Sequence, residues 1–263
     1  MSDRRVGRMA LTPEGLCGFE YDADWIRNGF SISPFYLPLK PGLVMAKQDP
    51  FGGNFGVFDD SLPDGWGNLL LDRYLQEKGI DPYKLNVLER LSLIGSTGRG
   101  ALEYRPDKSV ATDEEFLDFD HLAKEAENIL KSKESTGSVD LFYKYGGSSG
   151  GARPKVFTKI DEREWLVKFK ATSDPSNVGE IEYNYSILAK ECGIRMAETR
   201  LFGNHYFGVE RFDRTPQGKI HTASAAGLLH ANYRIPSLDY SILLKLTLNL
   251  TKDMEQVAEM FRL

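Results

Sequence analysis

The chain has 263 residues, of which 41% are hydrophobic and 27% are charged, which is enough apolar material for a folded core and excludes a mainly disordered protein. The formal net charge of −5 argues against nucleic-acid binding by the chain as a whole, although it is compatible with a local basic patch. Cys17 and Cys192 lie far apart, so neither a disulfide framework nor a zinc site is expected. The sequence has no apolar run of the roughly 18 residues that a membrane helix needs. It also lacks a secretion signal at its N-terminus, which is typical of a soluble, cytoplasmic protein without a membrane partner.

The first 105 residues predict a β-rich subdomain that also contains two helices. Apolar and polar residues alternate up to about residue 60 between turns rich in Gly and Pro, and the pattern becomes helical after Ser61. Trp66, near the start of the first helix, is expected to pack in the core. The expected elements are a small meandering sheet over 1–60, a helix over 66–78 closed by Gly79, a helix that opens at Asp81 and Pro82 and ends at 95–100, and a strand over 101–104.

The rest of the chain mixes strands and helices, and a boundary is expected near residue 105. In the segment 113–134 acidic residues come first and lysines last, as the dipole of a helix favours. The expected elements are a helix over that segment, strands over 139–145, 155–160 and 165–170, a helix over 177–192 closed by Gly193, strands over 199–202 and 206–212, and a helical tail over 237–263.

The most distinctive local feature is the segment 146–155 (GGSSGGARPK), between two expected strands. Glycines let backbone N–H groups turn towards a phosphate, and a nearby cation balances its charge. The segment does not match the Walker pattern, because no Gly-Lys-Ser/Thr closes it. An ordinary hairpin loop explains the segment equally well.

Lys168 lies inside an otherwise apolar strand, on the same face as Leu166 and Lys170. A partly buried lysine needs an anion such as a phosphate or a carboxylate. A solvent-facing lysine at a sheet edge is the simpler explanation of this residue taken alone.

Two glutamates, Glu180 and Glu182, lie on the helix that follows Lys168. Either could pair with that lysine, as the lysine–glutamate pair of protein kinases does. The segment 210–214 (ERFDR) then ends a strand, as a kinase hinge does, although solvated surface charge explains each feature separately. Glycine loop, strand lysine, helix glutamate and hinge-like strand nevertheless occur in the order of a kinase small lobe, which favours a nucleotide site.

Three segments resemble HipA-like toxin kinases: 58–67 (FDDSLPDGWG), 148–155 (SSGGARPK) and 210–214 (ERFDR). Shorter similarities occur at Glu182-Tyr183, 188–190 and Gly193-Ile194, and the resemblance runs from about residue 30 to residue 263. It implies an α+β fold with a HipA-like N-terminal β-rich subdomain over 1–105. A protein-kinase-like small lobe would follow over 106–214, and the start of a helical large lobe over 215–263.

The resemblance implies a bacterial toxin of a toxin–antitoxin pair that is a protein serine/threonine kinase using ATP and Mg²⁺. Lys168 would hold the ATP phosphates, the hinge backbone would meet adenine, and Asp213 would meet the ribose. The implied ATP-binding residues are Gly150, Gly151, Ala152, Lys168, Glu210, Phe212 and Asp213. The implied partners are a HipB-like DNA-binding antitoxin, with DNA contacted only through it, and an aminoacyl-tRNA synthetase as a protein substrate.

Ser148 resembles the loop serine that the family autophosphorylates, and Ser149 competes for that role. A phosphate there would eject the loop from the nucleotide site by charge repulsion. Glu182 is the implied helix partner of Lys168.

The sequence departs from the family at the catalytic machinery. No N-x-D-x-H-x-K-N-like catalytic loop and no later magnesium-binding aspartate follow, and the segment 253–263 resembles the helix that leads into that loop. We therefore expect a fragment (an expressed piece, a truncated reading frame or half of a split gene) that is inactive alone and has no catalytic or metal-binding residue.

Two other functions compete with a kinase fragment. An interaction module would dock an antitoxin or a complementary kinase half on an exposed apolar stripe of Val257, Met260, Phe261 and Leu263. The glycine loop could also belong to an unrelated phosphate-binding protein.

Overall fold

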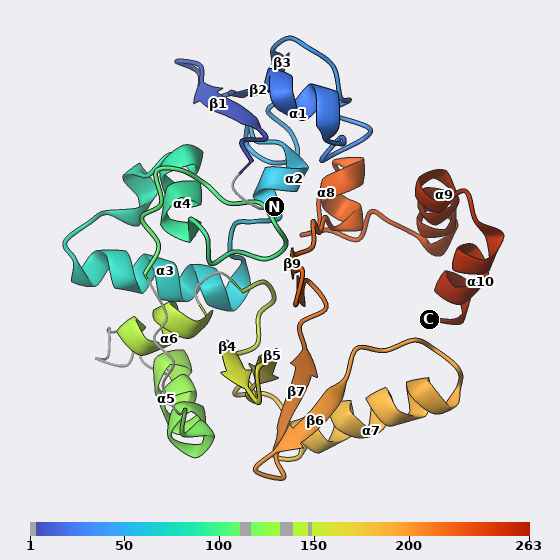
Figure 1. The fold of residues 1–263 in the computed structure, drawn as a ribbon. Helices are drawn as coiled ribbons and strands as arrows, with labels where there is room; N and C mark the ends of the chain where they lie inside the picture. The colour runs from blue at the N-terminus through green and yellow to red at the C-terminus, as the bar shows by residue number, and fades with distance from the viewer. Residues whose placement is uncertain (1–3, 111–116, 132–138, 147–148) are drawn as a thin grey trace.

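The computed structural model describes residues 4–110, 117–131, 139–146 and 149–263. The fold is α+β, with two larger antiparallel sheets, a third of only two short strands, and helices around them (Figure 1). Within these described residues no helix is both long enough and apolar enough to span a bilayer.

The N-terminal sheet has the order β1-β2-β3, built from Gly7–Leu11, Cys17–Tyr21 and Val44–Met45. It is smaller than the predicted meander, because two helices, α1 (Ala23–Asn28) and α2 (Gly56–Asp59), take up part of the segment. Aromatic and aliphatic side chains fill the core between the sheet and these helices, among them Phe19, Trp25, Ile32, Leu37 and Phe58.

The predicted helix over 66–78 is confirmed as α3 (Gly65–Glu77), and Gly79 follows it at φ +72°. The second helix starts later than predicted. Asp81 caps only a short 3-10 turn, Pro82–Lys84, and α4 (Val87–Ile94) begins at a capping box formed by Asn86 and Glu89. The predicted strand over 101–104 is wrong, because that segment has no strand partner.

Two helices lead to the second sheet. Within the predicted helix 113–134, the described part is helical as α5 (Phe119–Lys131). The strand predicted over 139–145 is wrong, because Val139–Gly146 forms a helix, α6. Val139, Phe142, Tyr143 and Gly146 are buried at the spacing i, i+3, i+4, i+7, so helical packing against α3 overrides the strand preference of the aromatic residues.

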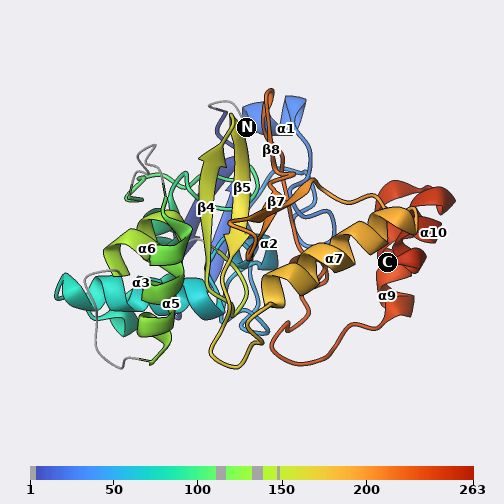
Figure 2. The ribbon, with the colours of Figure 1, turned by 90° about the horizontal axis from the view of Figure 1, so that it is seen from below.

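The second sheet has the order β4-β5-β7-β6 and is antiparallel throughout. Its strands are Lys155–Ile160, Arg163–Lys168, Tyr206–Glu210 and Thr199–Phe202, and α7 (Val178–Glu191) connects β5 to β6, as predicted. Trp165, Val167 and Phe169 face a core shared with α3, α5 and α6, so this core extends across position 105. The alternate residues of β5, among them Lys168, point to the other face of the sheet, where α7 packs against β6 and β7 (Figure 2).

The last 50 residues form a small hairpin and three helices. The hairpin pairs β8 (Arg214–Thr215) with β9 (Gly218–Lys219), and α8 (Ala225–Leu229), α9 (Tyr240–Thr251) and α10 (Met254–Arg262) follow. The predicted helical tail is therefore two helices, broken where Lys252 adopts the left-handed region at φ 55°. α9 and α10 pack against each other and stand at the side of the molecule (Figure 1).

Candidate functional site

Lys168 and Glu182 form an ion pair between β5 and α7. The distance from Lys168 Nζ to Glu182 Oε2 is 2.8 Å, and both side chains are about two-thirds buried, with exposed fractions of 32% and 27%. Glu180 instead lies near His205, with 3.4 Å between its Oε1 and the His205 Nδ1. From the sequence, either glutamate could pair with Lys168. In the structure, Glu182 forms this pair.

The orientation of α7 decides which glutamate reaches the sheet. Gly179, Glu182 and Ser186 share one face of the helix at the spacing i, i+3, i+7, and Gly179 and Ser186 are buried. A Cβ atom at Gly179 would clash with the backbone carbonyl oxygen of His205, just before β7, so the helix approaches the sheet too closely for any larger residue. In the sequence, the small residues Gly179 and Ser186 were the features that could have indicated which face of this helix packs on the sheet.

Lys155 is a second lysine of the site and is not among the residues predicted from the sequence. The register of β4 and β5 places it directly opposite Lys168, and its ammonium group donates to the carbonyl oxygen of Gly150. Burial and the neighbouring charge of Lys168 lower the pKa of Lys155 to about 8. The position of Lys155 at the end of the glycine-rich segment was the feature of the sequence that could have identified it as a site residue.

The glycine loop is held by the segment that precedes α3. The backbone N–H of Gly151 donates to the carboxylate of Asp64, and the N–H of Trp66 donates to the carbonyl oxygen of Gly151 at 3.0 Å. Gly65 lies between them at φ +35°, where a Cβ atom would be 2.8 Å from Cα of Ala152. The glycine loop at Gly151 and Ala152 is therefore hydrogen-bonded to, and closely packed against, residues 64–67 (DGWG). Trp66 is itself 1% exposed and packs edge-on against Phe142, which confirms its predicted place in the core.

Of the two candidate phosphorylation sites in the loop, Ser148 and Ser149, the structure describes only Ser149. Ser148 lies outside the described residues. Ser149 is 1% exposed, and its hydroxyl donates to the carbonyl oxygen of Gly146 at 2.6 Å. The hydroxyl of Ser149 is therefore already engaged inside the fold.

The predicted hinge residues follow one another at the end of β7 but differ in exposure. Glu210 pairs with Arg163 at 3.2 Å, and its backbone N–H donates to the carbonyl oxygen of Glu198. The side chain of Phe212 is exposed. Asp213 is only 6% exposed, so the three residues present quite different surfaces to a ligand.

The carboxylate of Asp213 ties β7 to the N-terminal domain. It accepts hydrogen bonds from the guanidinium groups of Arg211 and Arg214, and Oδ2 also accepts the backbone N–H of Gly100 at 2.8 Å. Burial opposes the ionisation of Asp213, but the hydrogen bonds and charges of the two arginines outweigh it and hold its pKa below the usual range. The ERFDR segment therefore docks on the glycine-rich segment 95–100.

The described residues contain no cluster of three or more His, Cys, Asp or Glu side chains that could hold a metal ion. Near the glycine loop, the carboxylates of Asp64 and Glu182 already accept hydrogen bonds from Gly151 and Lys168. These residues do not fit a magnesium site made by protein side chains alone.

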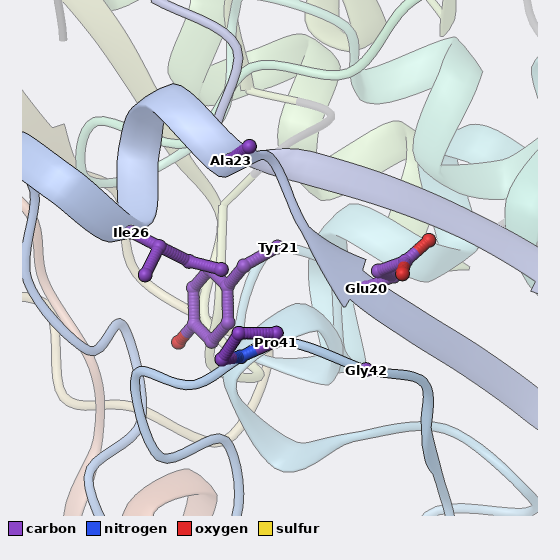
Figure 3. A pocket seen from close by; sticks show the side chains of 6 residues that line it. All are labelled: Glu20, Tyr21, Ala23, Ile26, Pro41 and Gly42. Carbon is purple, nitrogen blue, oxygen red and sulfur yellow. The ribbon is translucent and has the colours of Figure 1, made fainter.

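A pocket of about 290 Å³ lies in the N-terminal domain, between the sheet and α1 (Figure 3). The residues that line it are Glu20, Tyr21, Ala23, Ile26, Pro41 and Gly42. The lining contains one carboxylate and no cation, so it offers nothing that would attract a phosphate. The candidate phosphate site is the glycine loop with its two lysines.

The N-terminal domain and the region from the glycine loop onwards each match a protein family. Residues 1–105 match the HipA N-terminal domain, and residues 147–263 match the HipA-like C-terminal domain. The chain is therefore a HipA-like protein, as the SLPDGWG and ERFDR segments predicted. None of the curated proteins matches it.

Proposed function

We propose that the chain binds ATP at the glycine loop and the Lys168–Glu182 pair, as part of a HipA-like toxin with the fold of a protein serine/threonine kinase. The observation that carries this proposal is the 2.8 Å ion pair between a lysine of β5 and a glutamate of α7, beside a glycine loop. A lysine held in this way presents a fixed positive charge to phosphate oxygens, and Lys155 on the neighbouring strand adds a second one.

The other proposed contacts follow the chain order of a kinase small lobe. Gly150, Gly151 and Ala152 would lie along the phosphates, and the backbone of Glu210 and Phe212 would meet adenine. Asp213 is the proposed ribose contact. Among the described residues its Oδ1 accepts only from Arg211, which leaves this oxygen able to accept a further hydroxyl. When bound, ATP would bring Mg²⁺ with it, and the ion would neutralise charge on the phosphates.

We propose further that these 263 residues bind nucleotide without transferring its phosphate. They contain no match to the catalytic loop of the family, whose aspartate orients the attacking hydroxyl. Membership of the HipA-like proteins supports a HipB-like antitoxin as partner, an aminoacyl-tRNA synthetase as phosphorylation target and a place in the bacterial cytoplasm. It also supports Ser148 as the serine that becomes phosphorylated in the loop.

Two measurements on the full chain test the proposal. The first is the melting temperature with and without ATP-Mg, for the parent, Lys168→Ala and the control Lys170→Ala, an exposed lysine two residues beyond the end of β5. ATP-Mg should stabilise the parent and the control, and Lys168→Ala should abolish the shift. A shift of equal size in Lys168→Ala would remove Lys168 from the site.

The second measurement is the incorporation of labelled phosphate from ATP-Mg, with Ser148→Ala beside the parent. We expect no incorporation by this chain alone. Label that enters the parent and is lost in Ser148→Ala would contradict the proposed lack of phosphate transfer while supporting the proposed kinase fold.

A second candidate function is that of an interaction module, and the exposed apolar side chains of the last helices favour it. Of the predicted stripe, Phe261 and Leu263 are exposed, with fractions of 75% and 68%, whereas Val257 and Met260 are partly buried. Met254, at 65%, is a further exposed apolar side chain. Such a module would bind a HipB-like antitoxin or a complementary kinase half and would give no nucleotide-dependent shift in melting temperature.

A further inference from the structure

Arg99 of the N-terminal domain reaches the glycine loop. A Cβ atom placed on Gly150 would lie 2.6 Å from Nη1 of Arg99 and 2.9 Å from its Cζ, so the guanidinium group packs directly on the backbone of Gly150. The carbonyl oxygen of that same glycine accepts from the ammonium group of Lys155. Gly150 therefore lies between a cation from the N-terminal domain and a cation from the second sheet.

The backbone on both sides of Arg99 is fixed by the ERFDR segment. Arg214 donates to the carbonyl oxygens of Gly98 and Gly100, at 2.7 and 2.9 Å. Asp213 accepts the N–H of Gly100 at 2.8 Å. These three bonds hold the turn that carries Arg99, so its side chain starts from a defined position beside the glycine loop.

Within the part of the chain that the structure describes, the guanidinium group of Arg99 makes no ion pair with a carboxylate, and its hydrogen bond goes to the neutral carbonyl oxygen of Asp60 at 2.7 Å. Arg99 is exposed, so a ligand in solution has access to it. A planar guanidinium with free donors is suited to bind phosphate oxygens through two parallel hydrogen bonds.

We propose that Arg99 is a phosphate-binding residue for the nucleotide, supplied by the N-terminal domain and completing a three-cation site with Lys155 and Lys168. This inference rests on the proposed nucleotide site. It gives the N-terminal domain a direct part in nucleotide binding, and it makes Asp213 and Arg214 the positioning residues of Arg99.

The test is the affinity of the full chain for ATP-Mg and for adenosine, measured by calorimetry on the parent and on Arg99→Gln. Loss of a charged contact to phosphate should weaken ATP-Mg binding by about tenfold and leave adenosine binding unchanged. Arg99→Lys keeps the charge but not the planar fork, so it should recover part of the affinity. Arg105→Gln is the matched control, because Arg105 is an exposed arginine of the same domain whose partners are Glu103 and Asp107.

Three results would overturn the inference. Unchanged ATP-Mg affinity in Arg99→Gln, with Lys168→Ala still weakened, would refute the role of Arg99 and leave the proposed nucleotide site standing. An equal loss of ATP-Mg and adenosine binding in Arg99→Gln would show that Arg99 only holds the fold. A parent chain that binds neither ligand would refute the nucleotide site and the role of Arg99 together.

Discussion

Replacing Asp64 with alanine is expected to release the glycine loop from the N-terminal domain. The carboxylate of Asp64 is the acceptor for the N–H of Gly151, and the bond from Trp66 N–H to Gly151 would remain. The loop would then be bonded to residues 64–66 at one point instead of two. Asp64 lies before the first turn of α3 and makes no side-chain capping bond to that helix, so the helix itself should be little affected.

The size of the effect follows from the type of bond that is lost. A hydrogen bond to a charged acceptor contributes about 1.5–3 kcal/mol, and the exposure of Gly151 places this one at the lower end. A loss of about 1.5 kcal/mol shifts the equilibrium between docked and released loop by roughly tenfold. If only the docked loop binds ATP, the apparent affinity falls by up to the same factor. Asp64→Asn keeps a neutral acceptor and should therefore lose only part of the apparent affinity for ATP.

Hydrogen exchange at the Gly151 amide reads this equilibrium directly. Exchange should be roughly tenfold faster in Asp64→Ala, while the free energy of unfolding in urea should fall by no more than about 1.5 kcal/mol. Asp81→Ala is the matched control, because Asp81 also accepts a backbone N–H, that of Tyr83, at 3.0 Å, but lies away from the glycine loop in the sequence. An unchanged exchange rate at Gly151 in Asp64→Ala, or the same acceleration in Asp81→Ala, would refute the reasoning.

Two further predictions concern the core and the second lysine. Phe142 is 0% exposed and packs edge-on against Trp66 and Phe169, so Phe142→Ala should lower the free energy of unfolding by about 3–5 kcal/mol. A loss below about 1 kcal/mol in urea unfolding would contradict the packing of α6 as a buried helix. Lys155 has a pKa of about 8 in the folded chain against 10.5 ordinarily, so between these values the unfolded chain binds more protons and stability should rise with pH. ATP-Mg affinity should instead fall as the pH rises through about 8, because Lys155 loses its charge. Lys155→Met should remove both trends when urea unfolding and ATP-Mg titrations are compared at pH 7 and pH 9.5.

The sequence alone predicted the elements whose patterns are local. The helix over 66–78, the hairpin of β4 and β5, α7 and the hairpin of β6 and β7 were all predicted, because turn residues and apolar periodicity mark each of them within a few positions. The HipA-like resemblance rested on three short segments, 58–67, 148–155 and 210–214, while the order of the elements favoured a nucleotide site. The strand over 101–104 was predicted wrongly, and so was Val139–Gly146, where aromatic residues suggested a strand and burial against α3 produced a helix.

The site itself depends on contacts between segments far apart in the chain. The rotation of α7 selects Glu182 over Glu180, and the strand register sets Lys155 opposite Lys168. The docking of the two domains joins Asp64 to Gly151 and Asp213 to Gly100.

None of these pairings leaves a periodic pattern in the sequence, because a local pattern specifies which face of an element is buried and not what lies against it. The sequence therefore determined the parts of the proposed nucleotide site and their order. Only the packing of the two domains decided that Arg99 would lie beside the glycine loop.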